Sequence, residues 1–344
     1  MKGCSHNVAL VVGAGSFGTS IASVLSHNFK QVVLKVRSQD VYQDLKNGVN
    51  QLYLPGQTLS KNIVPALTWD EMDELAPKID LLVSGVPTSP LRSYLAENHD
   101  RLERYLKDGV PLVSLSKGID AETLELPDDL FLHQFTDFRD QLTFLSGPSF
   151  AKEIVDQQIT LVSLAGRSKQ VLEQVSIMMK TPYFKTFAGY DIKGTLLGGA
   201  LKNILAIGGG VIEGLGFNHN TRAAMITRGI TEMLRFGHVF NARPETFYGL
   251  SGMGDLILTT TGGLSRNKQF GMEIAKGRSA KEIISGERSV VEGYKTALAA
   301  HRLTERYDIN ARIFNGVYSV LYHGHSPQDV ITQLMMTPPK FEVD

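Results

Sequence analysis

One lysine stands out because almost everything around it in the sequence is apolar. Lys202 is the only ionisable residue between Lys193 and Glu213, in the stretch GTLLGGALKNILAIGGGVIE. A stretch that is hydrophobic on every face is typical of a buried helix. Burial lowers the pKa of an ammonium group, which is how proteins make a lysine into a catalytic acid or base. The alternative is a lysine that reaches solvent or sits in an internal ion pair.

Two stretches further along the chain carry groups that could act with this lysine. Asp255 follows two glycines in LSGMGDL, where its carboxylate could hold Lys202 or a substrate hydroxyl, or could simply cap a helix. Ser265 is a good N-cap, which places Arg266 and Asn267 in the first turn of the next predicted helix. Free backbone N–H groups, the helix dipole and an arginine together suit a phosphate better than a merely capped surface helix does.

A glycine-rich loop near the start of the chain joins a predicted strand to a predicted helix. The valine-rich run at residues 7–12 leads directly into the motif GAGSFG. In this motif Gly13 permits a tight turn, Gly15 lets backbone N–H groups reach a pyrophosphate, and Gly18 permits close packing of helix and strand. In this context the motif predicts a dinucleotide site, with an ordinary strand-to-helix turn as the alternative.

The residue expected to face the adenosine ribose is basic. NAD-binding folds usually carry Asp or Glu about 20 residues after the glycine loop. This chain has Arg37 and Ser38 there, with Asp40 close by. A cation suits a 2′-phosphate, so the sequence favours NADP(H) and leaves NAD(H) possible. The alternative is a solvated arginine, with the choice of cofactor made elsewhere.

The elements that must position these groups differ between the two halves of the chain. Buried strand patterns alternate with helical stretches in the first half, at residues 31–36, 79–87, 110–120, 141–147, 158–166 and 183–190. This alternation predicts an α/β fold with a doubly wound, mainly parallel sheet of the Rossmann type. Ligands bind outside the carboxyl ends of such strands, where Lys117 and residues 147–151 stand.

From about residue 191 onward the patterns are helical. The sequence therefore predicts a dinucleotide-binding domain at residues 1–190 and an all-α, substrate-binding domain at residues 191–344. The helix that carries Lys202 would lie at the junction, a preferred place for ligand sites.

Composition excludes several other classes of protein. The 344 residues exceed what one core usually supports, which agrees with two domains. Equal numbers of basic and acidic residues argue against nucleic acid as a partner. Cys4 is the only cysteine, so no intrachain disulfide can form, which fits a reducing cytoplasm. No apolar stretch is long enough and free of turn residues to predict a membrane span. The close pair His323 and His325 does not make a metal set.

Eight motifs follow one another in a specific order: GAGSFGTS, GVPTSPLR, SKGID, LSGPSFAKE, LLGGALKNILAIGGG, SGMGDL, SRNKQFG and SVVEGYKTA. In this order they resemble the NAD(P)-dependent glycerol-3-phosphate dehydrogenase family of the bacterial type, over nearly the whole chain. The resemblance implies a Rossmann domain followed by a helical domain, usually in a homodimer. It also implies reversible reduction of dihydroxyacetone phosphate to sn-glycerol 3-phosphate, which supplies glycerophospholipid synthesis.

The resemblance also assigns roles to individual residues. Lys202 corresponds to the catalytic lysine. The cofactor-binding residues, with the three loop glycines, would be Gly13, Gly15, Ser16, Phe17, Gly18, Arg37, Lys117, Ala151, Arg266, Val290 and Glu292. The substrate-binding residues would be Lys117, Gly147, Ser149, Lys202, Asp255, Ser265, Arg266 and Asn267.

The chain departs from the family pattern at three places. Leu196 stands where many members have an acidic or amide residue, Ile159 stands where many have proline, and residues 121–140 have an unusual spacing. Two other functions remain open at this point. One is a related reductase for another 2-keto or 3-hydroxy substrate, against which the SRN phosphate site argues. The other is a nucleotide-sensing protein without turnover, against which Lys202 argues.

Overall fold

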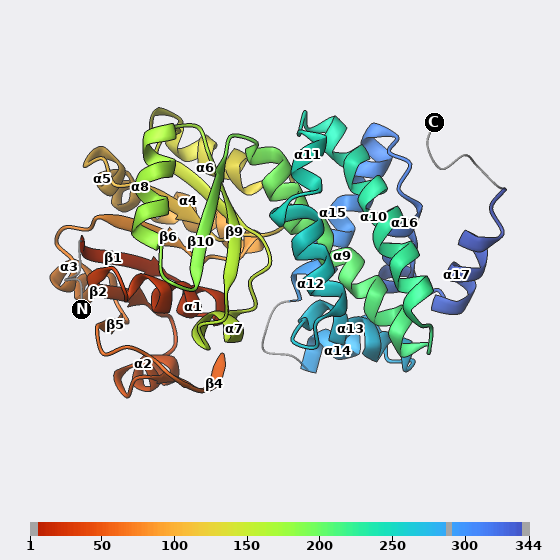
Figure 1. The fold of residues 1–344 in the computed structure, drawn as a ribbon, viewed down its shortest axis with the longest axis horizontal. Helices are drawn as coiled ribbons and strands as arrows, with labels where there is room; N and C mark the ends of the chain where they lie inside the picture. The colour runs from red at the N-terminus through yellow and green to blue at the C-terminus, as the bar shows by residue number, and fades with distance from the viewer. Residues whose placement is uncertain (1–5, 287–290, 339–344) are drawn as a thin grey trace.

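A computed structural model describes residues 6–286 and 291–338 of the chain, and Figure 1 shows its two halves side by side. The first half is built on an eight-stranded sheet in the order β10-β9-β8-β7-β6-β1-β2-β5. All neighbouring strands are parallel except β8 and β9. The predicted mainly parallel α/β fold is therefore confirmed. The strands of this sheet are β1 (His6–Val12), β2 (Phe29–Lys35), β5 (Ile63–Ala66), β6 (Leu81–Ser84), β7 (Leu112–Ser114), β8 (Leu142–Ser146), β9 (Thr160–Gly166) and β10 (Phe184–Gly189).

Helices cover both faces of this sheet, because alternate residues of each strand point to opposite faces. Leu10 and Val12 of β1 belong to the apolar cluster on one face, and Ala9 and Val11 belong to the cluster on the other. The helices of this half are α1 (Ser16–Leu25), α2 (Gln39–Lys46), α3 (Trp69–Leu75), α4 (Thr88–Glu97), α5 (His99–Lys107), α6 (Pro127–Phe135), the short 3₁₀ turn η1 (Thr136–Phe138), α7 (Ala151–Val155) and α8 (Lys169–Met179). A separate hairpin is formed by β3 (Val49–Asn50) and β4 (Leu54–Thr58).

The second half is helical throughout its described residues. Its central element is α9 (Ile192–Gly214), which α10, α12, α13 and α15 surround. The side chain of Asp191 caps α9 by accepting a bond from the Gly194 N–H at 2.9 Å. The other elements are α10 (His219–Val239), α11 (Pro244–Phe247), the π turn η2 (Leu250–Gly254), α12 (Asp255–Thr261), α13 (Arg266–Ala275), α14 (Ala280–Gly286), α15 (Glu292–Tyr307), α16 (Arg312–Tyr318), the π turn η3 (Ser319–His323) and α17 (Pro327–Met335).

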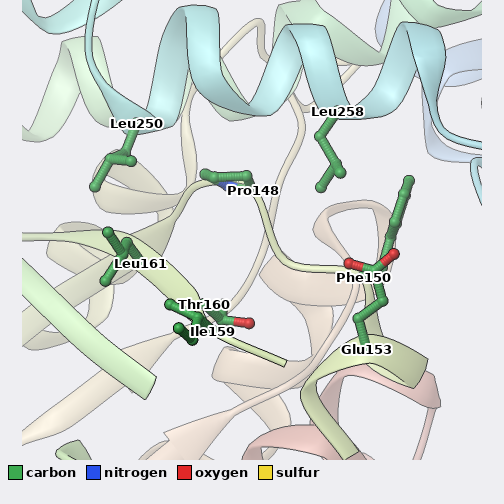
Figure 2. Close-up of a pocket in the computed structure, with 8 residues that line it drawn as sticks. All are labelled: Pro148, Phe150, Glu153, Ile159, Thr160, Leu161, Leu250 and Leu258. Carbon is green, nitrogen blue, oxygen red and sulfur yellow. The ribbon is translucent and has the colours of Figure 1, made fainter. Parts of the chain in front are cut away.

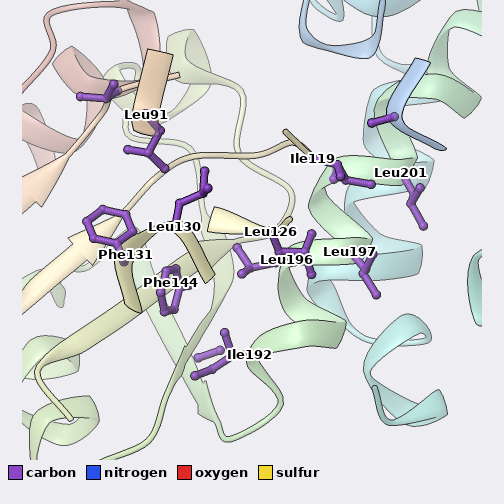
Figure 3. Packing of buried hydrophobic residues seen from close by; sticks show 14 of the residues in the cluster. Leu91, Ile119, Leu126, Leu130, Phe131, Phe144, Ile192, Leu196, Leu197 and Leu201 are labelled. Carbon is purple, nitrogen blue, oxygen red and sulfur yellow. The ribbon is translucent and has the colours of Figure 1, made fainter. Parts of the chain in front are cut away.

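α9 is long and apolar enough to cross a membrane, yet its most apolar stretch is completely buried within the protein. It is the one helix with these properties among residues 6–286 and 291–338. Its apolar surface is used instead to join the two halves of the chain. One cluster runs from the sheet through Leu126 and Leu130 of the α6 region to Leu196 and Leu197 of α9 (Figure 3). Leu196, where the family pattern is often polar, is therefore a buried apolar contact at this junction.

Candidate active site

Lys202 lies inside the protein and makes two hydrogen bonds there. Its side chain projects from the middle of α9, and the residue is only 8% exposed. The Nζ atom donates to Oδ1 of Asp255 at 2.8 Å and to Oγ1 of Thr259 at 2.8 Å. Of the arrangements that the sequence left open, the structure has an internal ion pair and not a lysine that reaches solvent.

Asp255 binds a second ammonium group as well. Its Oδ2 atom accepts a hydrogen bond from Nζ of Lys117 at 2.9 Å, and Lys117 also donates to the carbonyl of Gly147 at 3.2 Å. Lys117 follows β7 of the sheet, whereas Asp255 begins α12 of the helical half. Two cations and one carboxylate therefore meet across the junction, with Asp255 1% exposed. Although burial alone would raise it, the ammonium groups of Lys117 and Lys202 lower the pKa of Asp255.

The local backbone explains how these side chains come so close. Asp255 is the first residue of α12, directly after η2, and π turns often occur at functional sites. Gly198 of α9 lies against η2, since a Cβ atom there would be 2.5 Å from the Ser251 carbonyl oxygen. A Cβ atom on Gly199 would be 2.4 Å from Oγ of Ser146. Glycines next to Lys202 thus let the lysine helix approach both halves of the site.

Two ionisable groups at the site titrate near neutral pH. Burial lowers the pKa of Lys202 to about 8, although Asp255 opposes this shift. Burial also raises the pKa of Glu292 to about 7, against the opposing charges of Arg266, Lys117 and Lys202. Groups whose pKa values are moved toward neutrality in opposite directions are typical of sites that transfer protons.

The glycine loop lies next to this cluster. The ring of Phe17 is 5.3 Å from Nζ of Lys117, so the start of α1 borders the charged side chains. Gly13 has a φ of 104°, and a Cβ atom on Gly18 would be 2.0 Å from the Gly13 carbonyl oxygen. By contrast, a Cβ atom on Gly15 would meet open space, and no side chain caps α1. The loop therefore fits a dinucleotide pyrophosphate at its open helix end.

The predicted phosphate site lies at the start of α13. Ser265 caps this helix as the sequence predicted, by accepting a bond from the Lys268 N–H at 3.2 Å. Arg266 is exposed at the first position. The Asn267 side chain donates to Oδ1 of Asn203 at 3.0 Å and accepts a bond from the Gly293 N–H at 3.1 Å. Its amide therefore ties α13 to α9 and α15, and its backbone N–H lies in the first helical turn.

Four of the five remaining candidate residues lie in the described part of the chain. Ser149 donates to the Gly147 carbonyl at 2.8 Å, and Ala151 begins α7, which packs on α1. Arg37 is exposed just after β2. Val290 lies outside the described residues. Glu292 begins α15.

A separate cavity of about 270 Å³ borders the loop that contains Pro148 and Phe150 (Figure 2). It lies between the Pro148–Phe150 segment and the helical half, and it does not include the charged cluster. Its lining consists of Pro148, Phe150, Glu153, Ile159, Thr160, Leu161, Leu250 and Leu258.

Two residues of the site were missed at the sequence level. Thr259 follows Asp255 by one helical turn and bonds to Lys202, and Asn203 follows Lys202 directly and bonds to Asn267. The spacing of Asp255 and Thr259 could have indicated a shared helical face. No sequence signal indicates the contact between Asn203 and Asn267, which are brought together by the packing of α13 on α9.

A glycine loop on a parallel sheet, facing a buried lysine of a helical half, is the arrangement of a nicotinamide-dependent dehydrogenase. Residues 8–172 match the profile of the NAD-dependent glycerol-3-phosphate dehydrogenase N-terminus, and residues 191–332 match that of its C-terminus. Curated relatives named glycerol-3-phosphate dehydrogenase (NAD(P)+) come from Syntrophotalea carbinolica, at 38% identity, and Leptospira biflexa, at 39%. These alignments cover 97% and 96% of this chain and 99% and 98% of the relatives.

Solved structures agree with these matches. The glycerol-3-phosphate dehydrogenase of Coxiella burnetii superposes with a TM-score of 0.87 at 28% identity, over 96% of this chain and 99% of that one. The enzyme of Saccharomyces cerevisiae superposes with a TM-score of 0.77 at 26% identity, over 96% and 99% of the two chains. The chain belongs to the NAD-dependent glycerol-3-phosphate dehydrogenase family, and the resemblance carried by its eight motifs is confirmed.

Proposed function

We propose that this protein reversibly reduces dihydroxyacetone phosphate to sn-glycerol 3-phosphate with NAD(P)H. The observation that carries the proposal is the buried Lys202–Asp255–Lys117 cluster. It lies beside the glycine loop, at the junction between the two halves of the chain. The product is the backbone of glycerophospholipids, so the reaction would supply their synthesis.

The chemistry assigned to each residue follows from charge and position. A nicotinamide cofactor, when bound, would supply the hydride that C2 of the ketone accepts. The Lys202 ammonium stabilises the negative charge that develops on the ketone oxygen and then protonates that oxygen. In the reverse direction neutral Lys202 accepts the alcohol proton, which a pKa of about 8 permits near neutral pH. Asp255 orients Lys202 through its Oδ1 atom and holds Lys117 through its Oδ2 atom.

The phosphate of the substrate would bind at the start of α13. There the guanidinium of Arg266 and the N–H groups of the first turn, including that of Asn267, supply a cation and hydrogen-bond donors. Ser265, Gly147 and Ser149 complete the proposed substrate site. Binding energy from the phosphate, which does not react, would serve to position C2 beside Lys202.

We further propose that the cofactor preference is for NADPH. The family name covers both cofactors, and support for the preference comes from Arg37, an exposed cation directly after β2. The residues assigned to the cofactor are Gly13, Gly15, Ser16, Phe17, Gly18, Arg37, Lys117, Ala151, Arg266, Val290 and Glu292. We place the reaction in the reducing cytoplasm and assign residues 1–190 to a cofactor domain and residues 191–344 to a substrate domain.

We also propose that the protein is a homodimer. Leu161 of β9 and Phe187 of β10 share one face of the sheet by strand register, and Ile159 directly precedes β9. These residues are 38%, 47% and 82% exposed, respectively. The cavity of Figure 2, which Ile159 and Leu161 help to line, adjoins this face. Burial of such a face against a second copy is favourable. Analytical ultracentrifugation tests this proposal. We expect the wild-type protein to sediment as a dimer and Ile159→Asp to sediment as a monomer. A monomeric wild type would contradict the proposal.

The decisive experiment follows the absorbance of the reduced cofactor when purified protein, NADPH and dihydroxyacetone phosphate are mixed. We expect oxidation of NADPH by the wild type and a loss of orders of magnitude in Lys202→Ala. Cofactor affinity, measured separately, should be the same in both proteins. Activity that survives within a few-fold in Lys202→Ala would disprove the role of this lysine.

A further inference from the structure

The hairpin formed by β3 and β4 contacts the glycine loop from behind. Asn50 of β3 is completely buried, and its Nδ2 atom donates to the carbonyl of Ala14 at 3.0 Å. The same Nδ2 atom donates to Oγ1 of Thr19 at 2.9 Å, and Thr19 donates in turn to the Ala14 carbonyl at 3.2 Å. Two side-chain donors, from different parts of the chain, therefore converge on one carbonyl of the loop.

That carbonyl belongs to the peptide that joins Ala14 to Gly15. In a trans peptide the C=O and N–H groups point in opposite directions. When Asn50 and Thr19 hold the Ala14 oxygen toward the interior, the Gly15 N–H points away from the hairpin. The space beside Gly15 is open, as noted above, and this is the end of α1 where no side chain caps the helix.

The hairpin contacts the loop at a second point. Oγ of Ser16 donates to the carbonyl of Tyr53 at 3.1 Å, at the tip between β3 and β4. The far strand is tied down as well, because Gln57 donates to Asp156, just beyond α7, at 2.9 Å. The hairpin is thus fixed both to the glycine loop and to the segment that carries Ala151. It can therefore hold the Ala14–Gly15 peptide in one orientation.

We propose that Asn50 is a positioning residue for the pyrophosphate of the dinucleotide, acting through the Ala14–Gly15 peptide. This inference rests on the proposed use of NAD(P)H. Without the carboxamide, only the Thr19 hydroxyl holds the Ala14 carbonyl, so the peptide can turn this oxygen toward the pyrophosphate more easily, and two negative groups then oppose each other. Loss of the Asn50 side chain should weaken the binding of NADPH and NADH equally, because both contain the pyrophosphate. It should leave substrate binding around Lys202 unchanged.

The chain offers a closely matched control for this residue. Asn62 also makes two hydrogen bonds through Nδ2, in its case to the carbonyl oxygens of Ser26 and Phe29, both at 2.9 Å. Like Asn50, it has a buried Oδ1 atom without a hydrogen-bond partner among the described residues. It precedes β5 near the amino end of β2, whereas the glycine loop follows the carboxyl end of β1. Asn62→Ala therefore removes the same kind of contact away from the loop.

The test compares the dissociation constants of NADPH and NADH, measured by fluorescence titration without substrate. We expect Asn50→Ala to weaken both cofactors by the same factor, about tenfold, which corresponds to one lost hydrogen bond to the backbone. Asn62→Ala should leave both constants within about twofold of the wild type. In turnover assays the KM for NADPH should rise in Asn50→Ala, while kcat and the KM for dihydroxyacetone phosphate stay within about twofold.

A second pair of variants preserves side-chain shape in case Asn50→Ala does not fold. Thr19→Val removes the other donor to Ala14, and Thr143→Val removes a buried hydroxyl that donates to the Leu112 carbonyl in β7. Only Thr19→Val should weaken the cofactors. Equal affinities in each variant and its control would overturn the inference and leave the proposed function intact. A wild-type protein that binds neither cofactor would overturn both.

Discussion

Replacing Asp255 with asparagine changes the charge of the site with little change of shape. The amide oxygen of asparagine can still accept a hydrogen bond from Lys202, but the negative charge between the two ammonium groups is gone. In the wild type, Asp255 raises the pKa of Lys202 against the effect of burial, and Lys117 lowers it. Loss of Asp255 leaves burial and Lys117 acting in the same direction, so the pKa of Lys202 must fall.

The size of this change follows from the distance. An opposite charge at this range shifts a pKa by about 1–3 units, so a shift of about 2 moves Lys202 from about 8 to about 6. At a pH of about 7.5 the ammonium fraction then falls from about three quarters to about 3%. Ketone reduction requires the ammonium form, so its rate should fall roughly 25-fold from protonation alone.

The assay is the pH profile of kcat/KM in both directions. For reduction, the wild-type rate should decline as the pH rises through about 8, and the Asp255→Asn rate should decline from about 6. For oxidation of the alcohol, neutral Lys202 is the active form because it accepts the proton. Asp255→Asn should therefore stay active to lower pH than the wild type in this direction. A lower plateau with the descending limb still at the wild-type pH would refute this account of Lys202 and Asp255.

Three further predictions concern other parts of the molecule. Arg266→Ala should raise the KM for dihydroxyacetone phosphate roughly 10- to 100-fold, as expected for a lost charge-assisted hydrogen bond, and an unchanged KM would place the phosphate elsewhere. Arg37→Ala should raise the KM for NADPH about tenfold and leave that for NADH unchanged, so equal effects on both would exclude recognition of a 2′-phosphate. Burial raises the pKa of Glu232 in α10 to about 6, against hydrogen bonds from the N–H groups of Ile313 and Phe314. The folded protein thus binds this proton more tightly than the unfolded chain, and the resulting stability is lost as pH rises from about 4.5 to about 6. Urea unfolding should show that the free energy of unfolding of the wild type falls by about 2 kcal/mol relative to that of Glu232→Gln between pH 4 and 7. If the unfolding free energies of the two proteins change with pH in the same way, this prediction is wrong.

The parts of the fold that could be predicted are those with local signals. The glycine loop combines a strand, a turn and a helix start within a few residues, and Ser265 is a cap that needs only its own helix. β5 gave no such signal, because Pro65 interrupts it and proline argues against a central strand. In the structure β5 is the last strand of the sheet, at an edge where proline is tolerated.

The site was predictable in its charged residues and less so in their connections. Lys202 was conspicuous because its neighbours are apolar, but nothing in the sequence shows that Lys117 and Lys202 share Asp255. That contact depends on the junction of the two halves. Likewise, the sequence left Asp255 either to hold Lys202 or a substrate hydroxyl, or to cap a helix. In the structure Asp255 is the first residue of α12, after a π turn, and its carboxylate binds Lys202 and Lys117.

The burial of α9 has a consequence for the synthesis of the protein. Of the helices that contact α9, the last along the chain is α16, which ends at Tyr318, about 100 residues after α9 itself. At about 5–20 residues per second, a ribosome needs roughly 5–20 s to make them. During that interval only the first half of the chain, which packs on Leu196 and Leu197, can cover α9, and the rest of a segment with the length and hydropathy of a membrane-spanning helix stays exposed. The chain therefore passes through a stage at which much of α9, the segment that carries Lys202, is exposed and prone to aggregation until the later helices pack on it.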